Sequence, residues 1–210
     1  MKKIKCPTLR LNVVTLFVLI FCMPAYSATK SKPSQSSNDF YLSLGNLCEY
    51  VGKIQTDSNG GKNFCSFTPS LSLNYDYFVI PDFALSPEIG ATLPKSGRDS
   101  NIKTMTLYAL MNGKYKTSYV NFIVGAGVYL TRIWGPGGDE TLNNGNSSDS
   151  FPLPKDPVYT RNFIVNLGVS NEFSQDISGE LYTYIFNALK KEDRSFSLGF
   201  SLSYHFGEIL

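Results

Sequence analysis

The sequence holds few histidines and cysteines, with one histidine and four cysteines among 210 residues. Cys6 and Cys22 fall in an N-terminal segment that we expect to be removed. Cys48 and Cys65 have no nearby histidine or further cysteine to complete the four ligands of a zinc site. In an exported chain such a pair favours a disulfide over two free thiols, and we predict a Cys48–Cys65 bond.

Long runs of one charge are also absent. Past residue 28, the longest basic run is Lys190-Lys191, and acidic residues follow it at once. Removing the first 28 residues takes away four of the 19 basic residues and none of the 17 acidic ones, which leaves a formal net charge of −2. This balance provides no electrostatic footprint for nucleic acid.

The one extended apolar run, residues 11–21, lies at the N-terminus and is shorter than the roughly 20 residues that a transmembrane helix needs. Basic residues precede it, and Pro24 and the small residues of 25–28 follow it. We therefore predict a secretory signal peptide over 1–28, cleaved after Ser27 or Ala28. A lipoprotein signal at Cys22 is disfavoured because Phe21 stands where a small residue is needed. Residues 29–38 are polar and predict a disordered lead-in.

What the remainder has instead is apolar residues at every second position. The clearest example is 195–206, where Phe, Leu and Tyr alternate with Ser, Gly and His over about six repeats. A two-residue period predicts a strand whose two faces meet different surroundings. Similar segments begin near residues 40, 70, 83, 104, 120, 162 and 180, so we expect eight strands.

The links between these segments alternate between long and short. We expect long links at 46–66, 93–101, 133–157 and 187–194, and short ones at 79–82, around Asn112-Gly113-Lys114 and at 174–176. This alternation is typical of outer-membrane barrels, which have long extracellular loops and short periplasmic turns. The fold class predicted is all-β: an eight-stranded antiparallel up-and-down transmembrane barrel over 39–206, followed by a short extension, 207–210.

The end of the chain resembles the C-terminal signal read by the barrel assembly machinery. Its features are Gly199 and the alternating Leu202, Tyr204 and Phe206. With the signal peptide and the eight strands, the chain resembles the small outer-membrane barrels, a family that includes the OmpA membrane domain, OmpX and Ail. The resemblance implies an integral protein of the Gram-negative outer membrane, exported by the Sec route. The partners it implies are membrane lipid, lipopolysaccharide and the assembly machinery.

Polar-face positions supply the candidate interior residues. Asp76, Glu88 and Glu180 lie on the polar faces of their strands, and a charge that faces lipid costs several kcal/mol, so we expect them in the lumen. A hydrogen-bonded or ion-paired plug is favoured there over a proton or cation path, because small barrels fill their interiors with side chains. The alternation does not identify their basic partners.

The other motifs have structural interpretations. His205 is interpreted as a rim or lumen residue rather than a catalytic one, so we expect no enzyme. Gly135–Gly138 reads as a turn rather than a phosphate cradle, and 139–146 as a solvated loop rather than a calcium site, so no cofactor or metal is expected. Two aromatic girdles are expected: Trp134, Tyr129 and Tyr159 at the outer rim, and Tyr75, Tyr77, Phe83, Tyr119, Tyr204 and Phe206 at the inner rim.

Function on such a scaffold resides in loops. We expect adhesion or surface protection through the Cys48–Cys65 loop and the 133–157 loop, toward a host or environmental surface ligand. A narrow-pore channel is the alternative, and a lipid-modifying enzyme a third reading.

Overall fold

The computed structural model describes residues 38–49, 55–56, 62–63, 66–96, 101–143 and 148–207. The predicted signal peptide, all of the lead-in but Asn38, the extension after Gly207 and Cys65 lie outside these residues. Within the described part of the chain, no helix is long and apolar enough to cross a membrane.

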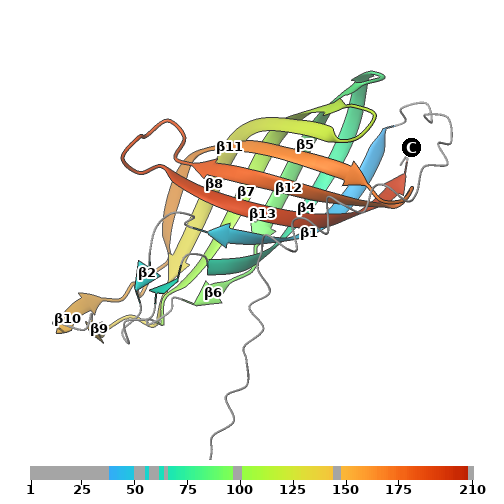
Figure 1. The fold of residues 1–210 in the computed structure, drawn as a ribbon. Coiled ribbons are helices and arrows are strands. Elements are labelled where there is room, and N and C mark those ends of the chain that lie inside the picture. The colour runs from blue at the N-terminus through green and yellow to red at the C-terminus, as the bar shows by residue number, and fades with distance from the viewer. Residues whose placement is uncertain are drawn as a thin grey trace, which may run out of the picture. The chain divides into compact units, whose positions relative to one another are not determined.

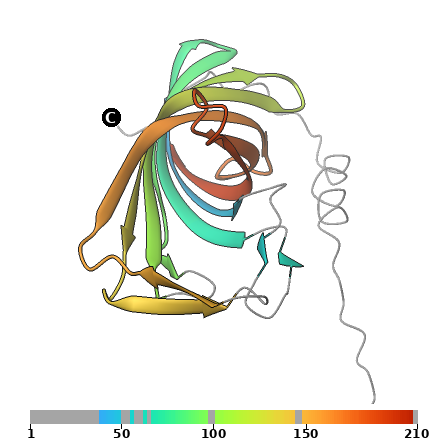
Figure 2. The same ribbon diagram turned by 90° about the vertical axis from the view of Figure 1, so that its left-hand side faces the viewer.

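Eight strands close into a barrel (Figures 1 and 2). Each pairs antiparallel with its neighbours along the chain, and the first pairs with the last to close the sheet. The predicted eight-stranded antiparallel barrel is therefore confirmed. The strands are β1 (Asp39–Glu49), β4 (Ser66–Ile80), β5 (Phe83–Thr92), β7 (Lys103–Lys116), β8 (Asn121–Trp134), β11 (Val158–Glu172), β12 (Ile177–Phe186) and β13 (Ser195–Gly207).

The two ends of the barrel carry different links. One end, called here the short-turn end, has the links 81–82, 117–120 and 173–176, together with the start of β1 and the end of β13. The opposite long-loop end has the links 50–65, 93–102, 135–157 and 187–194. All the minor strands lie in these longer links: β2 (Gln55–Thr56), β3 (Lys62–Asn63), β6 (Lys95–Ser96), β9 (Asp139–Asn143) and β10 (Ser148–Pro152).

Burial alternates along the strands as the sequence pattern predicts. In β5, for example, Ser86 and Glu88 are buried while Leu85 and Ile89 are exposed. Successive side chains of a strand point to opposite faces, so one set lines the interior and the other forms the outer wall. The interior set holds most of the polar residues, and the outer set is mostly apolar.

The interior has two zones. Toward the long-loop end, large side chains pack into one cluster: Leu47, Tyr108, Leu110, Tyr129, Ile164, Tyr182 and Tyr184. Toward the short-turn end, the buried side chains are mostly polar, including Ser43, Asp76, Ser86 and Lys114. The barrel is thus filled by side chains, as expected for eight strands.

The turn predicted around Asn112-Gly113-Lys114 is wrong. These residues lie inside β7, and the chain reverses at 117–120, where the Thr117 hydroxyl donates to the Val120 carbonyl oxygen at 2.6 Å. Asn112 and Lys114 both point inward and are buried. Their polar partners in the interior stabilise an extended backbone where an Asn-Gly pair would otherwise favour a hairpin turn.

The placement of Tyr129 in the outer girdle is also wrong. Its ring is 8 % exposed and packs inside the barrel, and its hydroxyl donates to Asn187 Oδ1 at 2.9 Å. Position 129 shares the inward face of β8 with Ile123, so the two-residue period decides its side. Five other girdle residues do face outward and are each more than half exposed: Tyr77, Tyr119, Tyr159, Tyr204 and Phe206.

Candidate functional site

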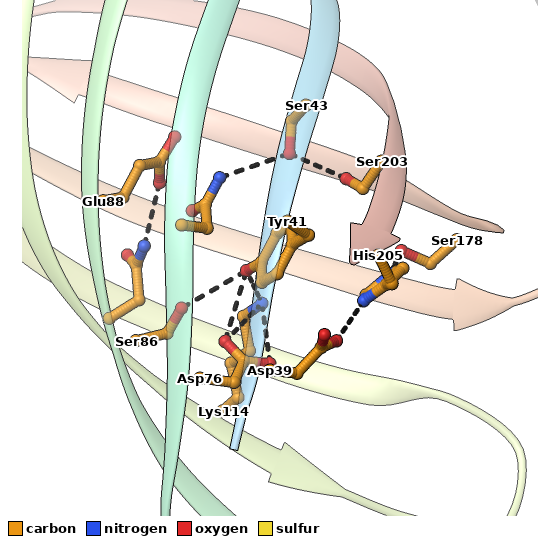
Figure 3. Close-up of polar contacts among 12 residues, drawn as sticks. Asp39, Tyr41, Ser43, Asp76, Ser86, Glu88, Lys114, Ser178, Ser203 and His205 are labelled. Carbon is orange, nitrogen blue, oxygen red and sulfur yellow. Dashed lines mark hydrogen bonds and ion pairs between the residues drawn. The ribbon is translucent and has the colours of Figure 1, made fainter. Parts of the chain in front are cut away.

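A buried lysine holds the polar zone together (Figure 3). Lys114 Nζ lies 3.2 Å from Asp76 Oδ1, and each side chain of this pair is 8 % exposed. Lys114 also donates to the hydroxyl of Tyr41, which in turn lies 3.2 Å from Ser86 Oγ. The four residues come from β7, β4, β1 and β5, so one cation joins half of the barrel wall.

Glu88 is held by neutral donors. Asn112 Nδ2 donates to Glu88 Oε2 at 2.9 Å, and the Tyr184 hydroxyl donates to Oε1 at 3.3 Å. Asn166 extends the network by donating to Asn112 Oδ1 at 3.1 Å. A buried carboxylate is tolerated only when such hydrogen bonds replace those to water.

Glu180 lines a small polar cavity between the two zones. Serine hydroxyls, tyrosine rings and Glu88 surround the same space; its lining is Ser43, Gly45, Ser70, Ser72, Glu88, Tyr108, Glu180, Tyr182, Tyr184 and Ser201. The structure thus brings Glu88 and Glu180 to one cavity, while Asp76 binds Lys114. The role of these acids as a plug stays a prediction.

His205 lies in a hydrogen-bonded chain at the short-turn end (Figure 3). Its Nε2 is 2.7 Å from Ser178 Oγ, and its Nδ1 contacts Asp39. The ring stacks on Tyr41 with 4.8 Å between centroids. Asp39 also accepts the Gly207 N–H at 3.2 Å. These contacts fasten β1 to β13 and β12, at the seam where the barrel closes.

Serine, histidine and aspartate in this order also occur in hydrolases. Here Ser178 is 7 % exposed, and the cavity around Glu180 does not include it among its lining residues. The observed contacts join the ends of β12, β13 and β1. The expectation that these residues have no catalytic role stays a prediction.

The assembly-signal residues divide between the two faces of β13. Leu202, Tyr204 and Phe206 point outward, each more than half exposed. Gly199 points inward, where an added Cβ would lie 2.3 Å from the ring of Tyr182. The structure gives Gly199 a packing reason of its own, and recognition by the assembly machinery stays a prediction.

The outer wall carries exposed apolar residues on all eight strands. Leu44, Ile89, Val124 and Val128 are each more than 60 % exposed, and they come from β1, β5 and β8. Further exposed apolar residues follow on the remaining strands: Leu73, Met111, Leu167, Ile177, Phe200 and Leu202. Soluble monomers rarely expose apolar patches larger than a few hundred Å².

Only part of each predicted loop site lies within the described residues. Cys48 lies near the end of β1, while its expected partner Cys65 lies outside the described residues, so the disulfide stays a prediction. Gly137 and Gly138 have φ values of 77° and 82°, which suit the predicted turn. The segment after them forms the β9–β10 hairpin, where only a solvated loop over 139–146 was predicted. Among the described residues, no group of three or more His, Cys, Asp or Glu side chains could hold a metal ion.

No family model matches the chain, and no curated protein matches it. Solved structures do. Ail, the attachment invasion locus protein of Yersinia pestis, is 12% identical over 81% of this chain and 100% of its own, with a TM-score of 0.49. The outer membrane protein OprG from Pseudomonas aeruginosa is 14% identical over 85% and 100%, with a TM-score of 0.49. Neisserial surface protein A is 16% identical over 81% and 100%, with a TM-score of 0.47. At these identities the likeness concerns fold alone, and the assignment as a closed eight-stranded barrel rests on the strand pairing described above.

Proposed function

We propose that the chain is an integral protein of the bacterial outer membrane whose long loops act outside the cell, in adhesion or surface protection. The observation that carries the proposal is the inside-out barrel, apolar on its outer wall and polar within. In lipid a sheet spans only if every backbone group is paired, which closure through β1 and β13 provides. Both described termini lie at the short-turn end, which fits a chain delivered from the periplasm.

The β9–β10 hairpin is the described segment best placed to meet a ligand. It lies in the longest link, beyond the barrel wall (Figure 1), and every residue of β10 is exposed. Phe151 within it is 48 % exposed. The packed tyrosine cluster in the interior favours a sealed barrel over the narrow-pore alternative. We propose no catalytic role for Ser178, His205 and Asp39.

Cells that carry the protein on their surface are expected to bind to host cells or extracellular matrix. Removing the hairpin is expected to abolish this binding. The Leu153 N–H donates to the Gly138 carbonyl oxygen at 2.7 Å, so the ends of 139–152 are already adjacent and a two-residue turn can join them. The measurement compares the adhesion of cells that display the parent protein with that of cells that display the deletion variant. A variant with Lys190→Gln and Lys191→Gln, in another loop at the same end, serves as control. Equal adhesion by parent and deletion, at equal surface amounts, counts against the proposal.

A further inference from the structure

Three basic side chains stand on the outer wall at the long-loop end. Lys103 of β7, Arg132 of β8 and Arg161 of β11 occupy outward-facing strand positions and are exposed. Among the described residues of the eight barrel strands, no other outward-facing position carries a charge. The rest of the outer wall is apolar or neutral, so these cations are a local feature that the lipid-facing wall does not require.

Strand register brings the three together on adjacent strands. Arg132 is paired with Met105 of β7 and with Tyr159 of β11. Lys103 and Arg161 lie two positions from those partners, which makes each a diagonal neighbour of Arg132 at roughly 7–8 Å. The outward faces of β7, β8 and β11 thus present one basic cluster, consisting of Lys103, Arg132 and Arg161.

Among the described residues, no carboxylate forms an ion pair with the basic cluster. In the described part of the chain, the ion pairs of the barrel are formed by Lys95, Lys114, Lys116 and His205, and none involves a cluster residue. The Arg132 guanidinium lies 5.0 Å from the Trp134 ring centroid, a contact that orients it without neutralising it. As far as the described strands and links extend, the cluster therefore presents unpaired cations beside an apolar wall.

The position of the cluster along the barrel axis indicates what kind of ligand it can bind. Arg161 is paired with Leu130, and Leu130 with Leu107, so this cation lies at the edge of the apolar part of the outer wall, toward the long-loop end. An aromatic pair, Trp134 and Tyr159, lies just beyond, as is usual at a membrane interface. A ligand with its anionic group at this level and its apolar chains alongside the wall is a lipid.

We infer that the basic cluster binds the phosphate groups of an outer-leaflet glycolipid of the lipopolysaccharide type. Guanidinium groups match phosphate with two parallel N–H···O bonds, and the lysine adds a third charge. The opposite wall, formed by β13, β1 and β4, ends in Phe196, Leu198 and Phe67 at the same end and carries no such cations. One side of the barrel is therefore the lipid-phosphate side. This inference rests on the proposed membrane location.

Trp134 is the sole tryptophan of the chain, so its fluorescence reports on the cluster directly. The full chain without its signal, folded in maltoside detergent, is titrated with diphosphoryl lipid A, with phosphatidylcholine and with inorganic phosphate. We expect saturable binding of lipid A and none of phosphatidylcholine. Replacement of all three cations by Gln is expected to weaken lipid A binding about a hundredfold, because each cation near a lipid surface is worth roughly fivefold and the three factors multiply. The single variant Arg161→Gln is expected to lose about fivefold.

The matched control removes three cations from loops at the same end: Lys155→Gln, Lys190→Gln and Lys191→Gln. It should bind lipid A as the parent does. Lipid A affinity unchanged in both the triple cluster variant and Arg161→Gln overturns the inference. Inorganic phosphate binding as tightly as lipid A overturns the assignment to a lipid. A chain that folds without detergent contradicts the membrane location instead, so the two failures are told apart.

Discussion

Lys114→Met is expected to lower the free energy of unfolding by about 3 kcal/mol, because it leaves the Asp76 carboxylate buried without its cation. The pair is 3.2 Å apart with both side chains 8 % exposed, so water cannot take the place of the ammonium group. The Tyr41 hydroxyl loses its donor in the same step. Urea unfolding of the protein refolded into lipid vesicles measures the change.

Two further variants distinguish the loss of the buried ion pair from the effect of replacing any lysine of the strand. Lys116→Met removes a cation from the same strand, where Lys116 is 34 % exposed and pairs with a 56 % exposed Glu172. Such a pair is worth less than about 1 kcal/mol. The double variant Lys114→Met with Asp76→Asn removes both charges and should recover most of the loss. An effect of Lys114→Met no larger than that of Lys116→Met would show that the buried pair does not hold the strands together.

Val128→Arg is expected to destabilise the barrel in lipid by roughly 2–4 kcal/mol. Val128 lies near the middle of β8, is 61 % exposed and has Ala109 and Phe163 as its neighbours across the sheet. An arginine there would face the hydrocarbon of a bilayer. On the surface of a water-soluble barrel the same change would alter stability by only about 0.5 kcal/mol.

Tyr159→Arg is the matched control for Val128→Arg. Tyr159 is also more than half exposed and faces outward, but it lies beside Arg132 at the long-loop end. An arginine near the interface costs roughly 0–1 kcal/mol. In urea unfolding experiments in vesicles, the free energy of unfolding should therefore be clearly lower for Val128→Arg than for Tyr159→Arg. Equal stability of the two variants would argue against a lipid-facing wall.

The fold was predictable from sequence because its signal is local. The two-residue period in eight segments predicts which face of the sheet each residue occupies. The interior positions of Asp76, Glu88 and Glu180 follow from this pattern. Lys114 was missed because Asn112-Gly113 is a strong turn signal, and only the pairing of β7 with β5 and β8 shows that the strand continues.

The rest of the candidate site depends on contacts between distant parts of the chain. Asp39 and His205 are 166 positions apart and meet because β1 and β13 close the barrel. The basic cluster combines residues from three strands, and each of them taken singly is an ordinary surface cation. Alternation predicts the face of each residue, whereas register decides which residues are neighbours, and register was not readable from the sequence.

The central claim is that the apolar wall faces lipid and the polar residues line a sealed interior. The most direct measurement is refolding of the chain without its signal, with and without detergent, followed by gel electrophoresis of boiled and unboiled samples. The inside-out barrel predicts a folded form, with altered mobility when unboiled, only where detergent is present. A monomeric, β-rich, folded chain in plain buffer would contradict it.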